Sequence, residues 1–102
     1  MRPDSNTSQP ATVTRFALGQ SFVTPGAEEA LQIAGQTEIE FLRRHMSGDF
    51  GELADQDAWG NELSLREGFR VLSAYRTAKG HIIWIITEAD RSATTILLPD
   101  EY

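Results

Sequence analysis

The residues best suited to chemistry gather near the C-terminus, where the last two predicted strands meet. Residues 88–95 combine two carboxylates, one guanidinium and three hydroxyls: Glu88, Asp90, Arg91, Ser92, Thr94 and Thr95. The Arg91 guanidinium is a planar fork of donors that suits a carboxylate or phosphate of a partner. A solvated turn explains the same composition, because Asp and Ser side chains bond to nearby backbone groups in turns. Glu88, Asp90, Arg91, Ser92 and Thr95 are therefore the first candidate site.

A second candidate pairs His45 with Asp49, four residues further along and near a predicted helix end. The two side chains would share a metal ion, or act as a general base and the carboxylate that orients it. In the alternative, His45 packs at the helix C-terminus and Asp49 shapes a turn. The chain has only one other histidine, His81, and no cysteine, which excludes a multi-histidine or thiolate zinc site. We expect neither a metal nor a cofactor.

Asn61 and Glu62 form a third candidate, within a predicted helix. Glu62 and Arg66 stand at i and i+4, where an exposed ion pair contributes only a few tenths of a kcal/mol. An inward-facing Asn61 would need buried partners, which a polar cluster with Glu88 or Arg91 would supply. The chain has no glycine-rich phosphate loop, no HExxH motif and no Ser-His-Asp order.

The charge of the chain restricts its partners. Fifteen carboxylates against nine Lys and Arg give a formal net charge of −6, which argues against direct binding to nucleic-acid phosphates. The excess is concentrated in residues 28–67, which hold ten carboxylates and three arginines. The longest apolar run, residues 82–86, is far shorter than the roughly 20 residues that span a bilayer. We expect a cytoplasmic protein without membrane contact.

The length of 102 residues suits one domain with one core. Residues 1–12 are polar and include two prolines, a composition that predicts a disordered tail before a single domain over residues 13–102. A short apolar stretch, broken by a glycine, predicts a short edge strand that ends at Val23. Its apolar members are Phe16, Leu18, Phe22 and Val23.

Three helices are expected next. Thr24-Pro25 is a typical helix start and Gly35 a typical stop, which predicts a first helix over residues 25–34. Thr37 and Glu40 match a capping box for a second helix that ends at Gly48. Its expected apolar stripe is Phe41, Leu42, His45 and Met46.

The third helix is expected over residues 55–67, with Asp55 as its cap. Trp59, Leu63 and Leu65 are expected to face inward from it. Beyond Gly68 the hydrophobic period changes from 3.6 to 2, which predicts strands over residues 69–76, 81–87 and 94–98. Short loops join these strands, so we expect a three-stranded antiparallel meander. A short strand, three helices and then a meander give the α+β class.

Several motifs between residues 21 and 102 carry a family resemblance: Thr24-Pro25-Gly26-Ala27, His45-x-x-Gly48-Asp49-Phe50-Gly51, Asn61-Glu62, Gly68-x-x-x-Leu72-Ser73-Ala74-Tyr75, and Trp84 to Ser92 followed by Pro99-x-x-Tyr102. On these motifs the chain resembles a family of small uncharacterised "plasmid-related" proteins of proteobacterial plasmids and integrated elements. Some members are labelled as type I restriction enzyme modification subunits. This chain lacks the glycine-rich turn that binds a methyl donor, so it does not support that label. The resemblance implies a bacterial, mobile-element setting and no particular chemistry.

We therefore expect a small cytosolic accessory protein of mobile genetic elements that binds another protein, with the carboxylates of residues 28–67 facing a basic partner. In one alternative, these carboxylates mimic the charge of DNA and inhibit a nucleic-acid-binding enzyme. In another, His45, Asp49, Glu88 and Arg91 converge in one cleft of a small nuclease or toxin-like enzyme. A homo-oligomer would form if residues 94–98 were a free sheet edge.

Overall fold

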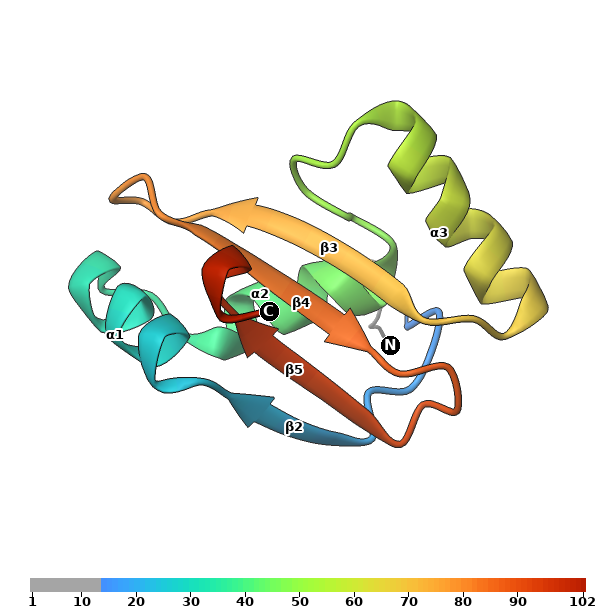
Figure 1. Cartoon of the computed structure of the whole chain (residues 1–102), viewed down its shortest axis with the longest axis horizontal. Coiled ribbons are helices and arrows are strands. Elements are labelled where there is room, and N and C mark those ends of the chain that lie inside the picture. Colours follow the sequence, from blue (N-terminus) through green and yellow to red (C-terminus); the bar gives the residue numbers. More distant parts are fainter. Residues whose placement is uncertain (1–13) are drawn as a thin grey trace, which may run out of the picture.

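The computed structural model describes residues 14–102, in which three helices pack with a four-stranded sheet (Figure 1). This confirms the α+β class; the tail expected over residues 1–12 lies outside the described residues. The elements are β2 (Gln20–Val23), α1 (Pro25–Ala34), α2 (Glu38–Ser47), α3 (Asp55–Glu67), β3 (Val71–Arg76), β4 (Ile82–Thr87), β5 (Ala93–Leu97) and the 3-10 turn η2 (Pro99–Glu101). None of the helices in this part of the chain is both long and apolar enough to cross a membrane.

The sheet has the strand order β2-β5-β4-β3. The last three strands form the predicted antiparallel meander, and β2 is the predicted edge strand. However, β2 runs parallel to β5, with Gln20 opposite Ala93 and Val23 opposite Ile96, so the sheet is mixed. The expectation of a free edge at residues 94–98 was therefore wrong. β5 is an inner strand because β2 occupies the side that β4 leaves open.

One face of the sheet packs against α1 and α2; in Figure 1, α2 passes behind the strands and α1 lies at their left-hand end. The buried side chains of this core come from both layers: Ala27, Leu31, Phe41, Leu42, Tyr75, Ile83, Ile85 and Ile96. Burying several large apolar side chains, each worth about 1.5–3 kcal/mol relative to full exposure, is the main force that holds the two layers together. A second, smaller cluster consists of Phe16, Phe50 and Val71, against which Ala58 and Leu65 of α3 pack.

The first helix begins and ends at the predicted residues. Thr24 Oγ1 accepts a hydrogen bond from Ala27 N at 3.2 Å, and Gly35 takes the left-handed conformation at the C-terminus. A carboxylate from η2 also reaches this helix start, since Glu101 accepts from Thr24 Oγ1 and from Gly26 N. A negative charge is favoured there by the helix dipole. The Thr24 hydrogen bond lowers the pKa of Glu101.

The second helix buries Phe41, Leu42 and His45, as the periodicity predicted, and Gly48 ends it. The predicted capping box is absent, because the Thr37 side chain makes no capping hydrogen bond. Glu40 instead accepts from Gln36 Nε2 at 3.0 Å. The helix is thus held by its buried stripe and its C-terminal glycine.

The third helix lies beside β3, at one edge of the sheet (Figure 1). Its N-cap is Ala54, not Asp55, and its bounds match the prediction. Ala58, Asn61 and Leu65 form the stripe that faces the rest of the protein. Trp59 lies off this stripe and is 66% exposed, so its assignment to the core was wrong. A helix that packs against a single strand edge needs only this narrow stripe.

Candidate functional site

The β4–β5 turn brings together four of the five residues of the first candidate site. Arg91 N donates to Glu88 O at 2.9 Å, and Asp90 Oδ1 accepts from Ser92 N at 3.0 Å. Hydrogen bonds from Ser92 lower the pKa of Asp90. Arg91 itself has φ 62, which places this non-glycine residue in the left-handed region. Thr95 lies apart from the turn, along β5.

The Arg91 guanidinium is used by the protein itself. Nη1 donates to the backbone carbonyls of Phe69 at 2.7 Å and Glu88 at 3.0 Å, and Nη2 donates to Ser64 O at 3.4 Å. Ser64 lies in the last turn of α3, where the helix dipole favours a positive charge. The guanidinium also lies over the Phe16 ring, 5.6 Å from its centroid. Arg91 therefore ties the β4–β5 turn to the end of α3 instead of presenting its donors to a ligand.

His45 is fully buried in a chain of hydroxyl groups. Its Nδ1 lies 2.6 Å from Ser73 Oγ and its Nε2 lies 2.8 Å from Thr87 Oγ1. Thr87 Oγ1 lies 2.7 Å from Thr94 Oγ1, which donates to Leu18 O at 2.8 Å. The chain of bonds thus links α2, three strands and the segment before β2.

The donor and the acceptor of each hydrogen bond in this chain follow from the last bond, in which Thr94 is the donor. Thr94 has one hydroxyl proton and donates it to Leu18 O, so Thr87 must donate to Thr94. His45 Nε2 must then donate to Thr87, and the neutral ring accepts from Ser73 at Nδ1. Burial, followed by the charge of Arg91, lowers the pKa of His45 from 6.5 to about 3. His45 is therefore a neutral structural group with its proton on Nε2.

The lowered pKa predicts that acid destabilises the protein through His45. Between the unfolded pKa of 6.5 and the folded pKa of about 3, the unfolded chain binds a proton that the folded chain does not. The free energy of unfolding should therefore be highest above pH 6.5 and fall by up to about 1.4 kcal/mol per pH unit below it. Urea unfolding between pH 7 and pH 5 measures this slope. The variant H45Q, which cannot titrate there, should show a flatter profile; equal slopes would contradict the assignment.

Asp49 is directed away from His45. Its carboxylate pairs with Arg44 at 2.7 Å and accepts from Gly51 N at 3.2 Å, and the Arg44 hydrogen bond lowers its pKa. The base-and-carboxylate pair that their spacing suggested is thus not formed. Over residues 14–102, no group of three or more His, Asp or Glu side chains is placed to hold a metal ion.

Asn61 closes the outer edge of β3. Its Nδ2 donates to Leu72 O at 2.5 Å, and its Oδ1 accepts from Leu72 N at 3.1 Å, as a neighbouring strand would. The loop before α3 continues this pairing at Ala74, which donates to Phe50 O and accepts from Glu52 N. The buried partner that Asn61 requires is therefore a backbone and not the cluster with Glu88 or Arg91.

Glu62 points outward and pairs with Arg15. The two side chains form a bidentate bond with distances of 2.7 and 2.8 Å, in place of the expected pairing with Arg66. This hydrogen bonding lowers the pKa of Glu62. Arg15 also lies against Gly48, where a β-carbon would come within 2.6 Å of its Nη1. The Arg15–Glu62 pair therefore joins the segment before β2 to the helix and to the loop beside it.

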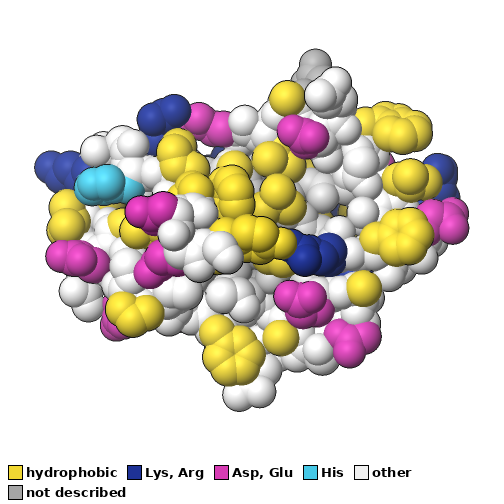
Figure 2. All heavy atoms as spheres, viewed as in Figure 1, with side chains coloured by type: hydrophobic (Ala, Val, Ile, Leu, Met, Phe, Trp, Pro, Cys, Tyr) yellow, Lys and Arg dark blue, Asp and Glu magenta, His cyan; other side chains and the backbone are white. Residues whose placement is uncertain are grey.

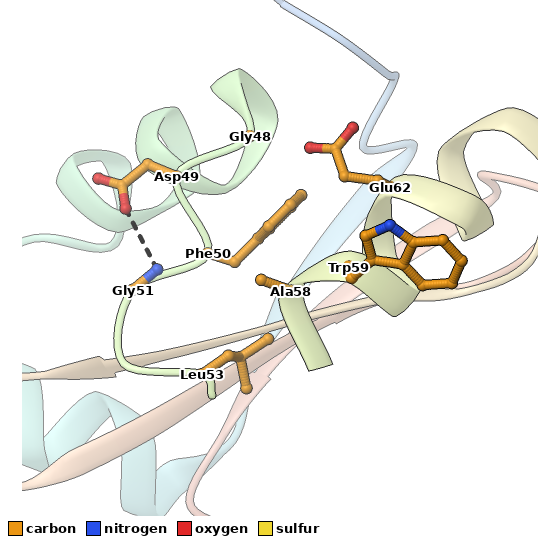
Figure 3. A pocket seen from close by; sticks show the side chains of 8 residues that line it. All are labelled: Gly48, Asp49, Phe50, Gly51, Leu53, Ala58, Trp59 and Glu62. Carbon is orange, nitrogen blue, oxygen red and sulfur yellow. Dashed lines mark hydrogen bonds between the residues drawn. The ribbon is translucent and has the colours of Figure 1, made fainter. Parts of the chain in front are cut away.

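An open pocket of about 380 Å³ lies between α3 and the loop that follows α2. Figure 3 shows Trp59 and Glu62 on the helix side, Phe50 and Leu53 on the loop side, and the Asp49 carboxylate turned away toward Gly51. The lining residues are Gly48, Asp49, Phe50, Gly51, Leu53, Ala58, Trp59 and Glu62. Asp49 and Glu62 were candidates from the sequence, whereas Trp59 was missed. The i, i+3, i+7 spacing of Ala58, Asn61 and Leu65 is the signal that would have placed Trp59 outside.

The comparisons with known proteins add no family. No protein-family model, no curated protein and no solved structure matches this chain. The resemblance to the "plasmid-related" proteins therefore stays an expectation from the motifs, and function must be inferred from the geometry of residues 14–102.

Proposed function

We propose that this protein is a non-catalytic binding domain that docks a segment of another protein in the pocket beside Trp59. The observation that supports this proposal is the exposure of Trp59, 66%, at a pocket whose lining also includes apolar side chains of the neighbouring loop. An exposed tryptophan keeps a large apolar surface in water, and tryptophan is among the residues that contribute most to binding at protein interfaces. The neighbouring Phe50, Leu53 and Ala58 give an inserted side chain apolar contacts.

The charges around the pocket favour a partner segment with an apolar side chain next to a lysine or arginine. Glu62 lines the pocket, and Asp57 is exposed on the same helix. The indole of Trp59 offers its face to a cation. Arg15 already pairs with Glu62, but exposed ion pairs contribute only about 0–1 kcal/mol, so a cation of the partner can compete for this carboxylate.

The two alternatives have less support from the geometry. A nuclease or toxin-like site needs His45, Asp49, Glu88 and Arg91 at one accessible point, whereas His45 is buried and Arg91 binds backbone carbonyls. A DNA mimic needs a continuous surface of unpaired carboxylates. The acidic residues of α1 and α3 lie at opposite ends of the molecule (Figure 1), and Asp49, Glu52 and Glu62 are ion-paired.

The test is capture of partners from a proteobacterial host lysate with the tagged full chain, its W59A variant and the matched control F69A, which removes another exposed aromatic ring, 57% exposed. A protein retained by the wild type and by F69A should be lost with W59A. The purified partner should then bind W59A at least about tenfold more weakly than the wild type. In a W84F background, the fluorescence of Trp59 should shift to the blue on binding. Equal retention by W59A and wild type would contradict the proposal.

Salt separates this proposal from charge mimicry. Contacts with the Trp59 indole and with the apolar side chains of the pocket persist at high ionic strength, while a surface that binds by charge alone loses affinity steeply. We expect the captured partner to remain bound at high salt. Its complete release by salt, with equal release from W59A, would favour the mimic.

A further inference from the structure

Within residues 14–102, the two outer edges of the sheet differ in whether their backbone groups have hydrogen-bond partners. The outer edge of β3 is closed by the Asn61 amide and by the loop that pairs with Ala74. β2 is the end strand on the other side of the sheet, and no strand within residues 14–102 pairs with its outer edge. An open strand edge is a template for pairing with another strand. An edge that no segment covers is therefore a candidate binding surface.

The unpaired groups of β2 can be assigned from its bonds to β5. Gln20 N donates to Ser92 O and Thr24 N donates to Ile96 O, so the even-numbered residues face β5. The alternation along a strand then turns the N–H and C=O groups of Ser21 and Val23 outward. Two donors and two acceptors therefore point away from the sheet.

The sequence of β2 lacks two of the features that keep a sheet edge unpaired, a charged side chain and a proline. Its residues are Gln20, Ser21, Phe22 and Val23. Phe22 is 47% exposed and stands at the end of a cross-strand row with Thr95, Ile86 and Leu72. This row lies on the face opposite α1 and α2, where Figure 2 shows hydrophobic side chains gathered over the middle strands.

We propose that a second copy of this chain pairs with β2 in the antiparallel direction, with the two-fold axis at Phe22. In this register Ser21 stands opposite the Val23 of the other copy, and Val23 opposite its Ser21. Each of these pairs exchanges two N–H···O bonds, so all four outward groups of each strand are satisfied. The two Phe22 rings meet as a close, non-hydrogen-bonded cross-strand pair and continue the apolar row from one sheet into the other.

The size and charge of this contact set its strength. Pairing of four-residue strands buries less than the roughly 1,200–2,000 Å² of a standard stable interface, so the dimer forms at about micromolar concentration or above. Each copy has a formal net charge of −6, and the repulsion between copies is screened by salt. Dimerisation therefore strengthens with added salt, in contrast to the docking of a basic partner.

Sedimentation equilibrium of the full chain tests the proposal from about 1 µM to about 1 mM, at low and high salt. The wild type should change from monomer to dimer with concentration. F22E places two like charges on the axis and should raise the dissociation constant at least about tenfold. The matched control I33E adds the same charge on α1, at an apolar side chain that is 53% exposed. This variant should dimerise as the wild type does. Circular dichroism checks that both variants are folded.

Amide hydrogen exchange gives a second readout that does not depend on a substitution. The Ser21 and Val23 amides should become protected as concentration rises, while the Phe22 amide, which bonds within the sheet, should be protected throughout. A monomer at every concentration, an unchanged dimer in F22E, or Ser21 and Val23 amides already protected in the monomer would each overturn the proposal. The last result would mean that another segment of the same chain covers β2.

Discussion

Alanine in place of His45 is expected to lower the free energy of unfolding by about 3–5 kcal/mol. The substitution removes a fully buried ring that packs edge-on against Phe16, with 5.0 Å between ring centroids. It also leaves the hydroxyls of Ser73 and Thr87 without their ring partner. An unsatisfied buried polar group costs about 1–3 kcal/mol, so the lost bonds add to the cavity. Urea unfolding at neutral pH, monitored by circular dichroism, measures the change.

The control for this prediction is the other histidine. His81 is exposed, so H81A should change the free energy of unfolding by no more than about 0.5 kcal/mol. H45Q keeps one donor and one acceptor and should lie between the wild type and H45A. If H45A proved as stable as H81A, the hydroxyl chain would not be part of what holds the layers together.

Alanine at Gly51 is expected to cost about 3 kcal/mol or more, for two separable reasons. Gly51 has φ 74, where a side chain is strained by about 1–2 kcal/mol. A β-carbon there would also lie 2.0 Å from Ala74 O and 2.6 Å from the Tyr75 ring, so the loop must move away from β3. Such a shift breaks the bonds that close the β3 edge and reshapes one wall of the Trp59 pocket. Thermal unfolding of G51A and partner binding measure the two effects.

Gly35 separates backbone strain from close approach. It has φ 69, but a β-carbon there would meet no atom within 4 Å. G35A should therefore cost only the strain of about 1–2 kcal/mol and leave partner binding unchanged. Equal losses in G35A and G51A would show that the contact with β3 is not tight.

The elements that the sequence predicted well are those with local causes. Thr24-Pro25 and Gly35 mark the two ends of α1, because helix capping depends on neighbouring residues. The alternation of apolar residues along β3 and β4 follows from the burial of the sheet against the helices. The pairing of β2 with β5 joins residues that are more than seventy positions apart, and no short pattern specifies such a neighbour. The meander was predictable because its loops are short.

The candidate sites show the same division. The turn role of Asp90 and Ser92 is local and was one of two interpretations open from the sequence. Arg91 and Asn61 also bind backbone groups outside their own elements, Phe69 O for Arg91 and Leu72 O for Asn61, and side-chain patterns contain no information on such partners. Trp59 was misplaced because hydrophobicity alone assigned it to the core, whereas α3 packs along only one narrow stripe.

The position of β5 between β2 and β4 has a consequence for the order of events during synthesis. β2 is the first of the strands in residues 14–102, yet it pairs with β5 (Ala93–Leu97), which follows β3 and β4 in the chain. The nascent chain can form its helices and the β3–β4 hairpin early, since these need only local contacts. Closure of the four-stranded sheet therefore follows these local steps, because β5 must be made before it can insert between β2 and β4.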